Sequence, residues 1–221
     1  MIKPAWRYFV FVVALSLATG PSGAPLPCAP FEGGRVEPQL LAAMRQAATE
    51  GRLYRVDNAV SRVGFCVRHF PFQEFRGEFT DIVGGLAFPR DRTQYGQALL
   101  LIRTASLQSD NRSLAPMVRG SNFMDTANYP EILYVGQKFE WFGSEHAHIY
   151  GDLTVRGRTH PVIFDADIEV PEDALDSWPE RVRLRGLSHV SRFNFDMHSH
   201  RLFVSDTVRL CLSVELVRWR P

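Results

Sequence analysis

Two pairs of histidines have the spacing of a metal chelate. His146 and His148 are separated by one residue, and so are His198 and His200. Residues two apart on a β-strand point to the same side, so either pair is able to hold Zn²⁺ or Cu²⁺ through ring nitrogens. Two histidines are only half of a site, and solvated strand ends near turns are the competing interpretation. We therefore assign no metal site and keep the four histidines as candidates. They would form a complete site only if the fold brought the two pairs together.

Carboxylates near these histidines allow two further chemistries. Glu145 or Asp196 would add an oxygen ligand to the neighbouring histidine pair. Asp165 and Asp167 share one face of an expected strand, which suits either acid–base catalysis or a solvated outer face. Neither Gly-x-Ser-x-Gly nor His-Glu-x-x-His occurs in the chain. The sequence therefore predicts no catalytic residue; a metal-binding module, or an enzyme acting on a small amphiphile, is the alternative to a binding protein.

The amino terminus has the pattern of an export signal. Residues 1–7 carry two cations and no acid, residues 8–18 are apolar, and small residues follow. We interpret residues 1–24 as a cleavable signal peptide, which predicts a periplasmic or secreted protein. The apolar run is shorter than the ~20 residues that span a bilayer, and no second run of that length occurs, so the mature chain is expected not to span a membrane.

Residues 25–52 form an extension that precedes the main domain. Leu40, Leu41 and Met44 recur at helical spacing, and Gly51 suits a helix end, so a helix is expected within residues 37–52. Its role is left open: it covers the following domain, extends an opening or mediates contact in a homodimer. Residues 53–221 are expected to form one domain.

The composition of the 221 residues is that of a folded protein, with 45% hydrophobic and 22% charged residues and a net charge of +1. This near-neutral charge gives no indication of nucleic-acid binding. After Leu53 the apolar residues mostly alternate, which indicates antiparallel strands in a sandwich or a closed barrel. Gly143-Ser144-Glu145 fits a hairpin and residues 171–179 a loop. The expected strands are 61–70, 75–89, 97–105, 132–142, 147–155, 162–170, 182–190 and 204–219. Gly84-Gly85 suggests a bend or bulge within the second of them.

Two apolar features favour a ligand inside this sheet. The strand at 97–105 is apolar on both faces, with Leu100 and Ile102 on one side and Leu99 and Leu101 on the other. The connection at 113–124 is also unusually apolar for a loop. For that connection, a plug or satellite core is an equal alternative to a ligand entrance.

Four segments in order along the chain resemble the YceI-like family of exported lipocalin-like proteins. The first runs from Tyr54-Arg-Val56-Asp57 through Ser61-x-Val63-x-Phe65-x-Val67-x-His69 to Gly77-x-Phe79. The second spans residues 106–130 and contains Arg119-Gly-Ser-Asn122-Phe123-Met-Asp125. The third is Gly151-Asp-Leu153-Thr154-Val-Arg-Gly157-x-Thr159-His-Pro161-Val162, and the fourth is Arg192-x-x-Phe195-x-Met197 with Val204-Ser-Asp206-x-Val208.

The resemblance implies an all-β fold, an extended eight-stranded antiparallel lipocalin-like barrel with a short helical insertion and the N-terminal helical extension. It implies binding of a long apolar molecule, such as a polyisoprenoid, an isoprenoid quinone or a fatty-acid derivative, for transport or sequestration in the periplasm, without a cofactor and without catalysis. The chain departs from the family pattern at Leu114, Ala115 and Met117, where polar residues are usual, and at Asp196, where glycine is usual.

Alternation and the resemblance together select the residues expected to contact the ligand. His69 is expected to be a hydrogen-bonded structural histidine first and a headgroup contact second. The other residues are expected to line the barrel or its entrance. The full set is Val63, Phe65, Val67, His69, Phe79, Leu100, Ile102, Met117, Val118, Phe123, Leu153 and Phe195.

Three cysteines complete the groups that could do chemistry. Cys66 and Cys211 alternate with apolar neighbours and are expected on the outer face, on the first and last strands. A closed barrel pairs these strands, so a Cys66–Cys211 disulfide is the preferred pairing. Cys28 pairing with either one, or three reduced thiols, are the alternatives.

Overall fold

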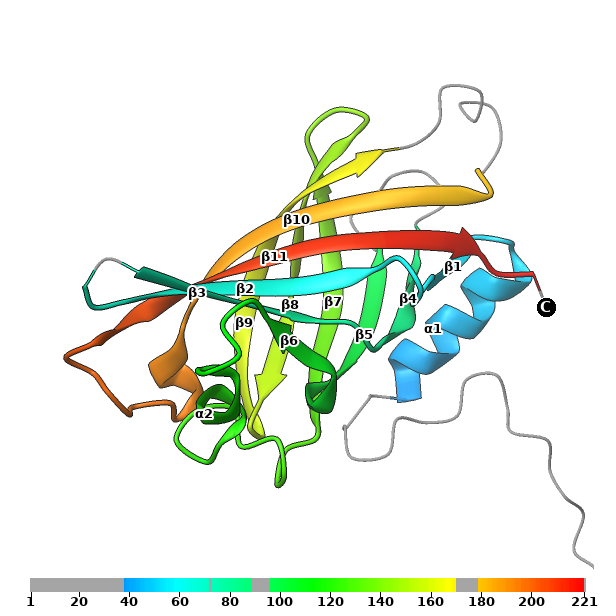
Figure 1. The fold of residues 1–221 in the computed structure, drawn as a ribbon. Helices are drawn as coiled ribbons and strands as arrows, with labels where there is room; N and C mark the ends of the chain where they lie inside the picture. Colours follow the sequence, from blue (N-terminus) through cyan, green and yellow to red (C-terminus); the bar gives the residue numbers. More distant parts are fainter. Residues whose placement is uncertain (1–37, 72, 89–95, 170–178, 221) are drawn as a thin grey trace, which may run out of the picture. The chain divides into compact units, whose positions relative to one another are not determined.

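The computed structural model describes residues 38–71, 73–88, 96–169 and 179–220. The expected signal peptide, Cys28 and nearly all of the loop at 171–179 lie outside these residues. The described chain is mostly strand, with two short α-helices and two 3-10 turns (Figure 1). The elements are α1 (Pro38–Thr49), β1 (Leu53–Val56), β2 (Arg62–His69), β3 (Gln73–Phe79), β4 (Ile82–Ala87), β5 (Gln97–Arg103), η1 (Thr104–Ser106), β6 (Leu107–Ser109), α2 (Ala115–Arg119), β7 (Glu131–Trp141), β8 (His146–Val155), β9 (Arg158–Glu169), β10 (Arg181–Ser191), η3 (Arg192–Phe195) and β11 (Val204–Arg218).

The strands form one antiparallel sheet that closes on itself. Its order is β1-β4-β5-β7-β8-β9-β10-β11-β2-β3-β6, and β1 also pairs with β11. The long strand β11 pairs with β2 over Val204–Ser213 and with β1 over Leu216–Arg218, so β1 and β2 act as two parts of one barrel strand. In the same way, β3 and β4 are two parts of a second barrel strand, and β5 and β6 are two parts of a third. The result is the predicted eight-stranded antiparallel barrel, in which closure removes exposed sheet edges.

The sequence predicted one strand over residues 75–89, but the structure breaks it into β3 and β4. At the break, the hydroxyl of Ser106 accepts hydrogen bonds from the backbone N–H groups of Thr80 (3.2 Å) and Asp81 (3.1 Å). The side chain thereby replaces a strand partner, which lets the chain bend without leaving buried donors unpaired. Just beyond the bend, Gly84 has φ +144°, and a Cβ there would lie 1.9 Å from the Leu99 carbonyl oxygen.

Helix α1 confirms the helix expected near the start of the domain and covers the outside of the barrel wall. Leu40 packs with Leu99 and Leu101 of β5, and with Leu133 of β7, in a cluster separate from the barrel interior. The outward apolar face of β5 is therefore explained by this helix. Our interpretation of that face as a sign of a ligand was wrong, because a strand buried on both sides needs only a covering element.

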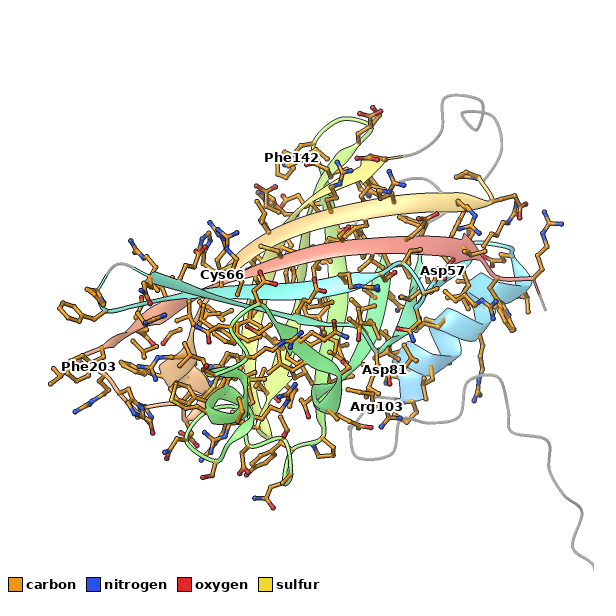
Figure 2. The ribbon with its side chains drawn as sticks, viewed as in Figure 1. Asp57, Cys66, Asp81, Arg103, Phe142 and Phe203 are labelled. Carbon is orange, nitrogen blue, oxygen red and sulfur yellow. The ribbon has the colours of Figure 1, made fainter. Side chains whose placement is uncertain are left out.

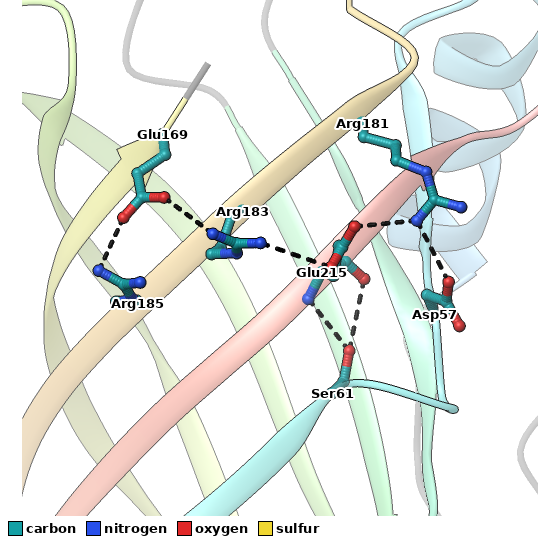
Figure 3. A network of polar contacts seen from close by, with 7 residues as sticks. All are labelled: Asp57, Ser61, Glu169, Arg181, Arg183, Arg185 and Glu215. Carbon is teal, nitrogen blue, oxygen red and sulfur yellow. Dashed lines mark hydrogen bonds and ion pairs between the residues drawn. The ribbon is translucent and has the colours of Figure 1, made fainter. Parts of the chain in front are cut away.

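Another part of the outer wall, formed by β9–β11, carries charged side chains. Glu215 of β11 pairs with Arg181 (2.9 Å) and Arg183 (3.9 Å) of β10, and Glu169 of β9 pairs with Arg183 (3.4 Å) and Arg185 (2.8 Å) (Figure 3). This alternation of outward charge and inward apolar residues fixes which face of β9–β11 forms the interior.

Candidate functional site

The barrel interior contains a cavity of about 270 Å³ at the end where α2 and η3 lie. This volume is close to the lower end of pockets that hold small molecules, ~300–1,000 Å³. The cavity wall includes all twelve residues that the sequence selected: Val63, Phe65, Val67, His69, Phe79, Leu100, Ile102, Met117, Val118, Phe123, Leu153 and Phe195. The structure thus brings them together around one space, and their contact with a ligand stays a prediction.

Sequence reasoning missed other residues of the wall. Many of them continue the same alternation on strands that were correctly predicted, so the period-two pattern could have found them. Others come from turns at the mouth, where no periodic signal exists. The missed set includes Phe70, Phe75, Leu114, Met124, Ile132, Tyr134, Val155, Phe164, Val190, Arg192, Met197, His200, Phe203, Val204, Val208, Leu210 and Leu212.

Tyr134 and Phe164 form the inner end of the cavity. Their rings meet edge to face with centroids 5.2 Å apart, and the Tyr134 hydroxyl donates to the Ile149 carbonyl (3.0 Å). Gly151 makes room for this ring, since a Cβ there would lie 2.8 Å from the Tyr134 ring. Burial raises the pKa of Tyr134 far above its ordinary value, so its hydroxyl stays neutral.

Beyond these two rings, the described part of the interior is filled by buried aromatic side chains. Phe139 is 0% exposed, and its ring meets those of Phe88 and Trp141, with centroid distances of 6.3 and 6.4 Å. Tyr54 meets Phe88 edge to face at 5.3 Å. None of these four residues lines the cavity. We call the region between the two rings and the mouth the hollow half, and the region beyond the rings the packed half.

The mouth of the hollow half is rimmed by exposed apolar residues. Phe70 and Phe203 line the cavity, are 66% and 58% exposed, and lie 6.3 Å apart between ring centroids. Met117 of α2 is 37% exposed on the rim. Leu114, Met117 and Val118 all line the cavity, so the apolar connection at 113–124 is part of the entrance. Figure 2 shows Phe203 at the far tip of this end.

Arg192 is the one arginine or lysine among the described residues of the cavity wall, and it is 2% exposed. Its guanidinium donates to the carbonyls of Ser205 (2.9 Å), Ser199 (2.9 Å), Val204 (3.0 Å) and Met197. Burial lowers the pKa of Arg192, but the group stays protonated because its ordinary value is so high. The side chain ties η3 to the start of β11 and so shapes the mouth.

The remaining polar side chains of the wall are histidines at the rim. The Nδ1 atom of His69 lies 3.3 Å from the Phe70 carbonyl, and the structural role of this histidine stays a prediction. His200 stacks on Phe123, with ring centroids 5.6 Å apart and an interplanar angle of 17°. The described wall contains no Ser, Cys, Asp or Glu side chain.

The two histidine pairs do not form one site. His146 and His148 lie at the start of β8, whereas Asp196 binds Arg158 at the other end of the β8–β9 hairpin (2.7 Å), about 30 Å away along a ten-residue strand. His198 and His200 lie in a turn and not on a strand, and His200 has φ +57°. The idea that each pair shares a strand face was therefore wrong for His198 and His200. Asp196 itself has φ +58°, the left-handed conformation that glycine usually supplies.

The expected disulfide is not formed in the structure. Cys66 and Cys211 lie on neighbouring strands, as expected, but both thiols are free. The reason is register: Cys66 is opposite Arg209, and Cys211 is opposite Gly64. Diagonal neighbours in an antiparallel sheet lie ~7–8 Å apart, beyond the usual reach of a disulfide. Burial, helped by the Cys66 thiol, raises the pKa of Cys211.

A closed antiparallel barrel with an apolar cavity in its interior defines a lipocalin-like binding barrel. The YceI-like domain family model matches residues 54–216, and this chain belongs to that family. A UPF0312 protein of Pseudomonas putida (strain GB-1) is 28% identical over 181 residues, which cover 81% of this chain and 89% of the relative. A UPF0312 protein of Ectopseudomonas mendocina (strain ymp) is 24% identical, covering 76% and 91%.

Solved structures share the fold. The crystal structure of Burkholderia cenocepacia BcnA matches with a TM-score of 0.64 at 19% identity, covering 72% of this chain and 98% of that one. A polyisoprenoid binding domain from Saccharophagus degradans, implicated in plant cell wall breakdown, matches with a TM-score of 0.59 at 12% identity, covering 75% and 98%. Within the described residues, no helix is long and apolar enough to cross a membrane.

Proposed function

We propose that this protein is an exported carrier or sequestering protein that binds a long-chain apolar molecule in the hollow half of its barrel. A polyisoprenoid, an isoprenoid quinone and a fatty-acid derivative all fit this description. The observation that carries the proposal is the cavity wall, which is almost entirely aliphatic and aromatic and opens at a rim of exposed Phe70, Phe203 and Met117. The polyisoprenoid binding domain with the same fold gives independent support for this class of ligand.

The chemistry of the wall favours a tail inside and a polar end at the mouth. Each methylene that leaves water for such a wall contributes ~0.8 kcal/mol, so a chain of modest length binds without specific polar contacts. Arg192, His69 and His200 all lie toward the mouth, whereas the inner end is closed by Tyr134 and Phe164. A headgroup placed at the mouth would stay in contact with water and lie beside His69 and His200.

Binding without catalysis is the function that this wall supports best. A carrier needs only a closed apolar space and an entrance, and both are present. Export to the periplasm, as the amino-terminal pattern predicts, would place the barrel where isoprenoid and acyl lipids leave the membrane.

Native mass spectrometry of the protein, exported by its own signal from a bacterial host, tests the proposal. We expect an added mass that organic solvent removes and that the extract identifies as a lipid. A Val67→Trp variant should lose this mass, because Val67 is half-buried and faces the cavity, and its new ring fills the hollow half. The matched control is Thr207→Trp, on an exposed position of β11, which should stay loaded. Wild-type protein that remains unloaded, even after incubation with a polyprenyl alcohol or a long fatty acid, would contradict the proposal.

A further inference from the structure

Four side chains on the outer wall of the barrel form a cluster that the binding cavity does not use. His146 and His148 share the outer face of β8, and Asp165 and Asp167 share the outer face of β9. The register places His146 opposite Asp167 and His148 opposite Asp165. The sequence pointed to each pair separately; the hairpin register brings them together.

The distances within this cluster are those of an incomplete metal site. One ring nitrogen of each histidine and one oxygen of Asp165 all lie within 4.8 Å of one another. The His146 Nε2 atom is 2.8 Å from Asp165 Oδ1, and the His148 Nε2 atom is 3.9 Å from the same oxygen. Tetrahedral Zn²⁺ at ~2.0–2.2 Å from each ligand needs ligand atoms about 3.3–3.5 Å apart. The side chains are 36–60% exposed, so small torsional changes can close this gap.

Asp167 lies where a carboxylate can orient His146 without binding the metal itself. Its Oδ1 atom lies 3.0 Å from the Nδ1 atom of His146, on the opposite side of the ring from Asp165. Metal-binding histidines usually donate their second ring N–H to such a carboxylate, which fixes the tautomer and the ring orientation. The same contact raises the pKa of His146 in the metal-free protein.

An aromatic neighbour packs against His148, and the nearby cations pair with other carboxylates. The ring of Phe142 meets His148 edge to face at 4.6 Å, and Figure 2 shows Phe142 at the β7–β8 turn, well away from Phe203 at the cavity mouth. The nearby cations are engaged elsewhere: Lys138 lies 3.8 Å from Glu140, and Arg185, opposite Asp167, binds Glu169. Among the described residues, no lysine or arginine forms an ion pair with Asp165 or Asp167.

We propose that His146, His148 and Asp165 bind one divalent transition-metal ion of the Zn²⁺ type, with Asp167 orienting His146. Two imidazoles and one carboxylate leave a fourth position for water or for a group of another molecule. The imidazole nitrogens select Zn²⁺ over Mg²⁺ and Ca²⁺, which prefer oxygen ligands. The site is independent of the cavity, since none of its residues lines the wall.

Isothermal titration of the exported protein with ZnCl₂ tests this site, with MgCl₂ as the negative control. We expect one Zn²⁺ per chain. His148→Ala should weaken binding at least tenfold, and Asp167→Asn should weaken it about 10- to 100-fold through the lost orientation of His146. His198→Ala is the matched control, because this histidine lies at the other end of the barrel, and it should bind like wild type.

Three results would overturn the proposal: a flat titration of the wild type, equal affinity for His148→Ala and wild type, or loss of Zn²⁺ on His198→Ala. The same variants separate this site from the proposed carrier function. His148→Ala should keep its bound lipid mass, and the unloaded Val67→Trp variant should keep its Zn²⁺ affinity. A Zn²⁺ affinity that fell with lipid loss would instead place the metal in the cavity and contradict the outer site.

Discussion

The two halves of the barrel interior are built from the same kinds of residue but do different things. In the packed half, Phe139 is 0% exposed and its ring is in contact distance of Phe88 and Trp141. In the hollow half, Phe65 is only partly buried and borders the cavity, with Phe75 and Phe79 at 5.9 and 5.8 Å. The packed half stabilises the fold, and the hollow half leaves apolar surface available for a ligand.

The largest expected effect compares one phenylalanine from each half. Phe139→Ala should lower the free energy of unfolding by about 3–5 kcal/mol, because it opens a void among packed rings. Phe65→Ala should cost about 1–2 kcal/mol, because its ring already borders open space. Urea unfolding of both variants measures the difference. Equal losses would mean that the two halves are packed alike.

Arg192 tests the mouth of the hollow half. Arg192→Leu leaves four carbonyls without their donor and should cost about 2–4 kcal/mol, with the water at the mouth replacing part of the loss. Arg192→Lys should not restore stability, since an ammonium cannot reach the same four acceptors. Thermal unfolding together with hydrogen exchange over residues 197–205 checks both. Wild-type exchange in Arg192→Leu would show that the mouth does not depend on this side chain.

The contact between α1 and the outside of the barrel extends the comparison to apolar residues that do not face the interior. Leu101→Ala should cost about 2 kcal/mol, at the low end for a buried leucine, because only one helix covers it. Ligand loading should be unchanged. Native mass spectrometry alongside urea unfolding separates the two effects, and loss of the bound lipid would mean that α1 shapes the cavity.

The smallest effect is expected in the charged network of β9–β11. Arg183→Ala should change stability by less than about 1 kcal/mol, since its side chain is 49% exposed and its two acidic partners keep other arginines. High salt should reduce the difference further. Unfolding in low and high NaCl measures it. A loss of stability greater than this, and not reduced by salt, would show that the charged network contributes more to the stability of the barrel than the account assigns to it.

Much of the fold followed from period-two alternation, but the boundary between the halves did not. Phe139 and Phe65 both face inward on alternating strands, and nothing in their spacing shows which of them borders a space. That difference depends on long-range packing, such as the Tyr134 ring over Gly151. The pairing of His146 with Asp167, and the offset of Cys66 from Cys211, likewise depend on strand register, which alternation leaves open.

The affinity of the unloaded protein for a series of fatty acids of increasing chain length tests the hollow half most directly. If the tail enters the cavity, each added methylene should tighten binding about fourfold, from ~0.8 kcal/mol each, until the space is filled, and Val67→Trp should remove this dependence. Affinity that does not change with chain length would contradict the account, because it would mean that no alkyl tail enters the barrel.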